Sequence, residues 1–269
     1  MTAPLEPTVL TPTVLTPTVL TPTATLGDLV VADARRAAVF DRAGIDYCCN
    51  GHRTVAEAAR DAELDVDDLL RSLDLPGDPA SSAAPATGVT GDGGARELSS
   101  LAHDIVDTHH AYLWEEMPRL QALVDKVHGV HGDRHPELAE VRATYAAIVA
   151  DLDPHLAAEE RRVFPMIRRL ESGATASAPV LAAALADDLR AGLAALRAEH
   201  DHVGGLLRQL RSLTGGYAVP ADSCGSYRAM LAGLEAMEKD IHEHIHKENN
   251  ILFVRVEALL AAGGTDAHG

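Results

Sequence analysis

Aromatic residues, cysteine and basic residues are all scarce in this chain of 269 residues. Phe, Trp and Tyr make up 3% of the sequence, and the 46% of hydrophobic residues are mostly Ala and Leu, which favours packed helices over β-structure. Of only three cysteines, two are adjacent, which is a poor disulfide framework and predicts a reducing, cytoplasmic setting. A net charge of −17 argues against binding to nucleic acid or to an anionic membrane.

Long apolar runs are also absent. No stretch approaches the roughly 18 residues that would indicate a membrane span, and the N-terminus lacks the charged and then apolar pattern of a signal peptide. Histidine, in contrast, is abundant. Twelve of the 14 histidines fall between residues 103 and 246, so any function that depends on histidine is expected in this part of the chain.

The most informative pattern is a His, a Glu four residues later and a Phe five residues after that. It occurs twice, in HLAAEERRVF and HIHKENNILF, at His155, Glu159 and Phe164 and again at His244, Glu248 and Phe253. Positions i and i+4 share one face of a helix. A further His precedes each copy, His110 by 45 residues (155 − 110) and His200 by 44 (244 − 200), which indicates an internal duplication of a helix pair.

Two such pairs, facing each other in a bundle, would bring four His and two Glu together. This is the ligand set of a carboxylate-bridged two-metal centre. Glu159 and Glu248 are the natural bridges, and the four His are terminal ligands that leave coordination positions open. Nitrogen and oxygen donors suit Fe, Mn or Zn. A single i,i+4 pair is usually structural, but the duplication favours the metal site.

Other histidines are weaker candidates. His242 and His246 form a rival i,i+4 pair, but the segment around His155 has no equivalent pair. His109 and His202 are expected to be exposed or to support the ligands. The spacing does not choose among the cluster His128, His131 and His135. A straight helix would separate His110 from His131 by about 31 Å, so the chain would have to bend for both to reach one centre.

Composition divides the chain into four parts. Residues 1–24 contain three TVLTP repeats and form a tail that proline keeps from folding regularly. Residues 25–75 predict a small helical domain, and residues 76–94, rich in Pro, Gly, Ser and Ala, predict a flexible linker. Residues 95–262 predict an all-α, up-down-up-down four-helix bundle because four helical stretches are joined by short connections.

Local signals define several helix ends. Asp33 and Asp65 are expected helix starts, Thr54 with Glu57 matches a capping box, and Gly44 is an expected stop. The four bundle stretches are expected at about 95–127, with a possible bend at Pro118, and at 136–172, 178–213 and 223–262. Pro154 and Pro165 are expected to bend or end parts of the second stretch.

Cys48 and Cys49 lie in DYCCNGHRT, shortly before Gly51, His52 and Arg53. Adjacent cysteines rarely bond to each other because the resulting ring is strained. A nearby cation and the start of the next helix would lower the pKa of a thiol, so we expect reactive thiols rather than inert apolar residues. Cys224 has no such neighbours and is expected to be structural.

These segments resemble a known family. GIDYCCNGHRTVAEAA is similar to the N-terminal signature of the iron–sulfur cluster repair di-iron proteins, and HLAAEERRVFPMI, AEHDHVG and HIHKENNILF resemble that family's hemerythrin-like domain. The resemblance covers about residues 25–260. Val254 stands where the family usually has Pro, and the TVLTP tail is not part of the family pattern.

The resemblance implies a cytoplasmic protein with two non-haem iron ions that helps to repair iron–sulfur clusters damaged by nitric oxide or oxidants. Damaged iron–sulfur proteins would be its partners, NO or O2 its small ligands, and a homodimer is left open. Cys48 and Cys49 correspond to the family's cysteine pair. The implied ligands, among which His131 comes only from the resemblance, are His110, His131, His155, Glu159, His200, His244 and Glu248.

Two other functions use the same centre. The first is a di-iron NO reductase or peroxidase, which would consume NO catalytically and release N2O. The second is a hemerythrin-like sensor or carrier, which would bind O2 or NO reversibly without repair activity. We expect a protein that repairs clusters and handles iron or NO rather than a conventional turnover enzyme.

Overall fold

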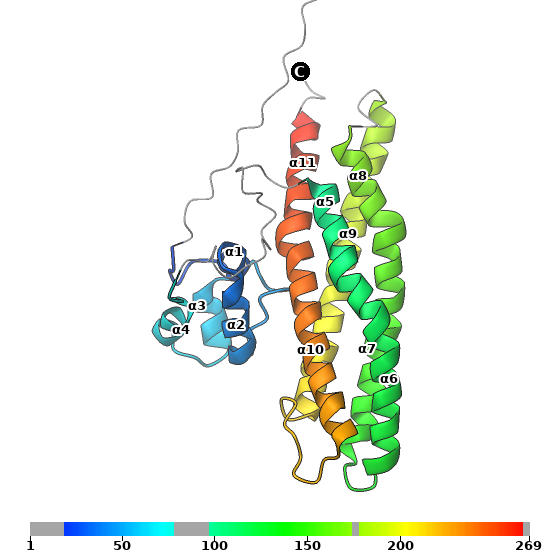
Figure 1. The fold of residues 1–269 in the computed structure, drawn as a ribbon. Coiled ribbons are helices and arrows are strands. Elements are labelled where there is room, and N and C mark those ends of the chain that lie inside the picture. Colours follow the sequence, from blue (N-terminus) through cyan, green and yellow to red (C-terminus); the bar gives the residue numbers. More distant parts are fainter. Residues whose placement is uncertain (1–18, 78–96, 174–177, 266–269) are drawn as a thin grey trace, which may run out of the picture.

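A computed structural model describes residues 19–77, 97–173 and 178–265, and these residues are predominantly helical (Figure 1). Within these ranges the β-pairing is limited to an isolated bridge between Thr25 and Thr54. The predicted all-α class is confirmed. Most of the predicted tail and linker, residues 1–18 and 78–96, lie outside the described residues. No helix of the described part is long and apolar enough to span a membrane.

The N-terminal part contains four short helices, α1 (Leu26–Ala32), α2 (Ala37–Ala43), α3 (Val55–Asp61) and α4 (Val66–Leu73). Asp33 caps a 3-10 turn, η1 (Ala34–Arg36), that leads directly into α2. Gly44 ends α2 with a φ of 67°, a conformation that costs glycine little. Thr54 and Glu57 form the predicted capping box, and Asp65 caps α4.

In the described residues 97–173 and 178–265 the helices join into four long rods, which lie side by side (Figure 1). The third rod is α9 (Pro179–Leu213), and each of the others contains a five-residue π turn. The first rod consists of α5 (Leu98–Ile105), η3 (Val106–His110) and α6 (Ala111–His131). The second consists of α7 (Glu137–Ala158), η4 (Glu159–Val163) and α8 (Phe164–Glu171). The fourth consists of α10 (Gly225–Lys247), η5 (Glu248–Leu252) and α11 (Phe253–Thr265).

Prolines do not break these rods. Pro118 lies inside α6 and Pro154 inside α7, and both helices continue through them. Buried residues on both sides of Pro118, such as Leu113 and Leu120, hold α6 in place by packing against the neighbouring helices. The first rod therefore runs on from His110 to His131 as one helix.

The small N-terminal helices pack against the bundle near the junction of α10 and α11 (Figure 1). One hydrophobic cluster includes Phe40 and Tyr47 from the small part together with Ile241 and Ile245 from α10. Asn250 reinforces this contact. Its Nδ2 donates to the carbonyl oxygens of Tyr47 (3.3 Å) and Cys48 (3.2 Å).

Two glycines make this approach possible. A Cβ added to Gly51 would overlap the Asn250 side chain, and one added to Gly27 would lie 2.9 Å from Asn250 Oδ1. The small helices therefore dock on η5, the same π turn that begins with Glu248.

Candidate metal centre

The duplicated motif produces the same local structure twice. η4 begins at Glu159 and η5 begins at Glu248, so both Glu residues stand where an α-helix widens into a π turn. Such turns often occur at functional sites. The matched phenylalanines cover the upstream His rings. Phe164 stacks on His110 at 5.8 Å, and Phe253 stacks on His200 at 6.1 Å.

Four buried residues converge in a first group, the His110 quartet, which comprises His110, His244, Glu159 and Glu248. His110 Nε2 lies 3.2 Å from His244 Nε2 and 3.3 Å from Glu159 Oε2. His244 Nε2 lies 3.0 Å from Glu248 Oε1 and 3.9 Å from Glu159 Oε2. One cation placed among these atoms would contact all four side chains.

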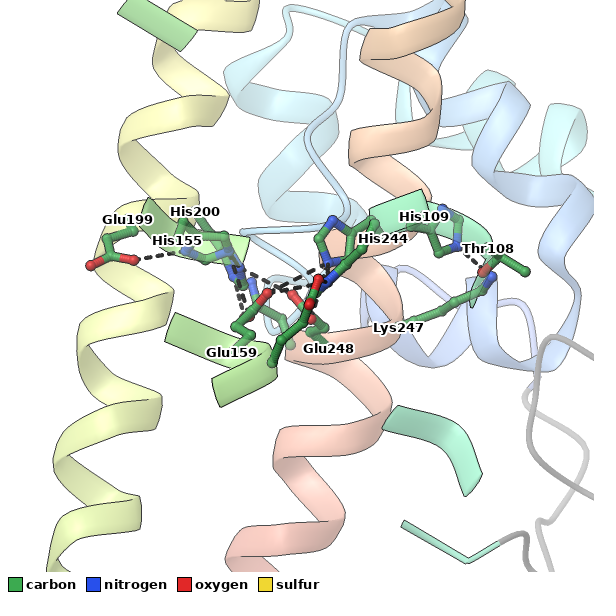
Figure 2. A network of polar contacts seen from close by, with 12 residues as sticks. Thr108, His109, His155, Glu159, Glu199, His200, His244, Lys247 and Glu248 are labelled. Carbon is green, nitrogen blue, oxygen red and sulfur yellow. Dashed lines mark hydrogen bonds and ion pairs between the residues drawn. The ribbon is translucent and has the colours of Figure 1, made fainter. Parts of the chain in front are cut away.

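A second group, the His155 quartet, comprises His155, His200, Glu159 and Glu248. His155 Nε2 lies 3.1 Å from His200 Nε2 and 3.5 Å from Glu159 Oε1. His200 Nε2 lies 3.2 Å from Glu248 Oε2. Each Glu thus directs one oxygen at each quartet, which is the arrangement of a bridging carboxylate (Figure 2).

The two carboxylates give the strongest indication that this site binds cations. Both Glu159 and Glu248 are fully buried, and none of their four oxygens has a hydrogen-bond partner in the described structure. Burying two adjacent carboxylates without compensation is costly. Two cations among four imidazole nitrogens would supply the compensation, so the donor set fits a dinuclear centre.

Burial and the closeness of the ligands to one another also shift the pKa values of Glu159, Glu248 and His244. Burial and the neighbouring charge of Glu248 raise the pKa of Glu159 to about 7. The imidazoles of His244 and His200 keep the pKa of Glu248 low despite its burial. Burial lowers the pKa of His244 to about 3, so this ring stays neutral and its lone pair is available to a metal.

Three of the four His rings are oriented through Nδ1. That atom donates to Glu160 Oε1 in His110 (3.0 Å), to Glu199 Oε2 in His155 (2.7 Å) and to Asn249 Oδ1 in His200 (3.0 Å). This contact leaves Nε2 free to face the centre. Figure 2 shows Glu199, which lies on α9, beside His155.

His244 differs because its Nδ1 has no hydrogen-bond partner in the described structure. Its ring instead stacks on His109, with centroids 5.6 Å apart and planes 9° from parallel. His109 is in turn fixed by Asp240, 2.8 Å from its Nδ1, and by Lys247, 2.6 Å from its Nε2.

The structure therefore brings together six of the seven predicted metal ligands but not His131. His131 lies at the end of α6, and its Nε2 is 3.2 Å from Cys224 Sγ. The reason is the unbroken helix, since the bend that would carry His131 back to the centre does not occur. Cys224, expected to be structural, is exposed, and backbone N–H groups of α10 together with His131 lower its pKa to about 7.

The rival histidines serve other contacts. His242 Nδ1 lies 3.1 Å from Asp41, and His246 Nδ1 accepts from Asn250 at 3.1 Å, so both support the docking of the small helices. His202 is exposed and pairs with Asp151 at 3.3 Å.

Cys48 departs from the expected low thiol pKa. The Cys49 side chain, burial and the nearby Asp46 raise the pKa of Cys48 well above its ordinary value. Arg53, the expected cation, instead pairs with Asp61. Cys48 is 2% exposed, whereas Cys49 is partly exposed.

Sequence reasoning anticipated a supporting role for His109 but missed Glu160, Glu199 and Asn249, which orient the ligands. Glu160 and Asn249 directly follow the two bridging glutamates, so they occupy the same position of the duplicated motif. Glu199 and His109 likewise directly precede His200 and His110. The duplication could have identified these residues. Side chains adjacent in sequence to the duplicated ligands occupy equivalent positions in the two halves and therefore lie beside the centre.

The fold and the centre define a hemerythrin-like, cation-binding helical bundle. Residues 101–256 match the family described as the hemerythrin HHE cation binding domain, and residues 22–75 match a domain of unknown function, DUF542, also called ScdA_N.

Curated relatives match nearly the same span. The iron–sulfur cluster repair protein YtfE of Yersinia pseudotuberculosis (serotype O:1b, strain IP 31758) is 33% identical over 232 residues, which cover 86% of this chain and 95% of the relative. YtfE of Yersinia pestis (strain Pestoides F) gives the same identity and coverage. The chain belongs to this family of two-part iron–sulfur cluster repair proteins.

Proposed function

We propose that this chain holds two iron ions in its bundle and restores iron–sulfur clusters damaged by nitric oxide or oxidants. One observation carries the metal assignment. The four oxygens of Glu159 and Glu248 are buried without hydrogen-bond partners, and each faces imidazole nitrogens of one quartet. The names of the relatives support the repair role.

His110 and His244 would hold one iron, His155 and His200 the other, and both glutamates would bridge the pair. Iron bound here would supply open positions for a diatomic ligand such as NO or O2, or a store of ferrous iron for a damaged cluster. Nitrogen and oxygen donors also accept Mn and Zn, so metal analysis has to establish the ion.

The surrounding residues fix the ligands and keep the centre dry. Glu160, Glu199 and Asn249 each hold the proton of a His ring on Nδ1. Phe164 and Phe253 cover two rings on their outer faces. The centre therefore sits in a rigid environment of low polarity, where each ligand is already oriented before a metal arrives.

The client proteins would be iron–sulfur enzymes, and a reducing, cytoplasmic compartment suits the three free cysteines of this chain. The docked cysteine loop places Cys49 at the surface close to the bundle, where a client could reach it. We expect NO or O2 as small ligands of the centre.

The test is repair of a [4Fe–4S] hydratase that has been inactivated with NO. The iron-loaded chain should restore hydratase activity, and the Glu159→Leu/Glu248→Leu double variant should not. Equal recovery with both proteins, or none with either, would contradict the proposal.

The same samples discriminate the enzymatic alternative. NO supplied in excess, together with a reductant, should be bound in an amount comparable to the protein. Sustained N2O release over many turnovers would instead identify a di-iron NO reductase. Reversible binding of O2 or NO without any recovery of the hydratase would identify a carrier or sensor.

A further inference from the structure

Three donor side chains lie together outside the bundle centre, on the loop between α2 and α3. Asp46 Oδ1 accepts from the backbone N–H of Cys49 at 2.9 Å and from Cys48 Sγ at 3.3 Å. The two sulfur atoms are 3.9 Å apart. Ligand atoms of all three residues lie within 4.8 Å of one another.

These separations match what a single metal ion requires. With metal–sulfur bonds of about 2.3 Å, two thiolates on one tetrahedral ion are about 3.8 Å apart. A thiolate and a carboxylate oxygen on the same ion are about 3.6 Å apart. The loop shows 3.9 Å and 3.3 Å for these pairs, so a cation could bind after adjustments of a few tenths of an ångström.

The surroundings hold the donors in this arrangement. Asp46 Oδ2 accepts from Arg208 Nη1 at 3.0 Å and from Asn50 Nδ2 at 3.1 Å, which leaves Oδ1 directed at the thiols. Nδ2 of Asn249 donates to the Cys48 carbonyl at 3.3 Å. The cysteine loop is therefore fixed from both the small helices and the bundle.

The loop is also accessible. Cys49 lines a cleft of about 460 Å³ between the small helices and the bundle, together with His52, Arg197 and Asp201. Asn249 lines the same cleft, and its Oδ1 accepts from His200 of the His155 quartet. One side chain thus contacts both a ligand of the bundle centre and the backbone of the cysteine loop.

We propose that Asp46, Cys48 and Cys49 form a second metal site, which binds one divalent cation of soft or borderline character such as Fe2+ or Zn2+. Binding replaces the two thiol protons, which pass to solvent, by the cation, and Asp46 supplies a hard oxygen beside the two sulfurs. Its use, which rests on the repair function proposed above, is to hold a ferrous ion near the cleft on its way between the bundle centre and a client.

Cobalt(II) added to the metal-free full chain tests the site, because thiolate-to-cobalt charge-transfer absorption is absent from sites with only nitrogen and oxygen ligands. In the Glu159→Leu/Glu248→Leu variant, where the bundle does not compete for the ion, we expect this absorption to saturate at about one equivalent of cobalt per chain. It should disappear in Cys49→Ser and in Cys48→Ser, and weaken in Asp46→Asn. Circular dichroism on each variant checks that the fold is kept.

Cys224→Ser is the matched control because Cys224 is the third thiol of the chain and has a possible nitrogen ligand, His131, beside it. This variant should keep the absorption. The Glu159→Leu/Glu248→Leu variant should keep it too, which separates this site from the bundle centre. The proposal is overturned if the wild type shows no thiolate band, or if the band survives in a Cys48→Ser/Cys49→Ser variant. A wild-type chain that shows the thiolate band but binds no metal in the bundle would refute the dinuclear centre alone.

Discussion

The two quartets have the same ligand types but different support. In the His110 quartet, a carboxylate (Glu160) orients one ring, and His109 stacks on the other. In the His155 quartet, a carboxylate (Glu199) orients one ring, and an amide (Asn249) orients the other.

The amide makes the important difference because it can accept and donate at once. Asn249 accepts from His200 and donates to Cys48, whereas Glu160 accepts from His110 and from Trp114 Nε1 (3.1 Å). Asn249 therefore links the His155 quartet to the cysteine loop, whereas a carboxylate at this position could not donate to the Cys48 carbonyl. The two halves of the duplication thus present similar quartets, and the residue that differs between them at this matched position, Asn249, connects the His155 quartet to the small helices.

The largest expected effect comes from removing one terminal ligand on each side. His110→Ala should lose the metal of its quartet, and His200→Ala the metal of the other, so that each variant keeps about one of two ions. Metal analysis after gel filtration measures this. Loss of both metals in either variant would show that the two positions do not fill separately.

A smaller loss of metal affinity is expected when the carboxylates that accept from the ligand Nδ1 atoms, Glu160 and Glu199, are replaced. Glu160→Gln should weaken metal binding in the His110 quartet by about 10–100-fold, because the amide polarises the imidazole less than a carboxylate does. Glu199→Gln should do the same in the His155 quartet. Competition with a chromophoric chelator gives both affinities, and unchanged affinities would show that these contacts only fill space.

The shared carboxylate predicts a common pH dependence for the two quartets. The Glu159 carboxyl, with a pKa of about 7, must lose its proton before it can bridge two ions. Because protons and metal compete, affinity should fall as the pH falls below 7, by about tenfold for each pH unit. Chelator competition between pH 5 and pH 8 measures the slope. A flat profile would contradict the bridging role of Glu159.

The smallest effect tests the connection to the small helices. Asn250→Ala removes the donor to the Tyr47 and Cys48 carbonyls and should cost about 1–3 kcal/mol in local stability. Faster hydrogen exchange in the cysteine loop would report it. Arg161 occupies the matched motif position in the other half and is exposed, so Arg161→Ala should leave this exchange unchanged.

The sequence predicted the four bundle stretches and the six residues that the structure brings together, because a helix translates i,i+4 spacing directly into geometry. It did not predict α1, which precedes the expected helix start at Asp33. His131 was added by resemblance and lies outside the centre, because α6 continues unbroken through Pro118. Whether a proline bends a helix depends on the packing around it, which the sequence alone does not reveal. The π turns at Glu159 and Glu248 have no signature in a single sequence. The docking of Asn250 between Gly27 and Gly51 was equally hidden, because it joins residues about 200 positions apart.

Two cations shared by Glu159 and Glu248 are the central feature of the proposed metal centre. The decisive measurement is the metal content of the chain purified without oxygen, beside the Glu159→Leu/Glu248→Leu variant. We predict about two irons per chain in the wild type and almost none in the variant. Equal metal content in both proteins, or little iron in the wild type, would contradict the dinuclear centre and the functions built on it.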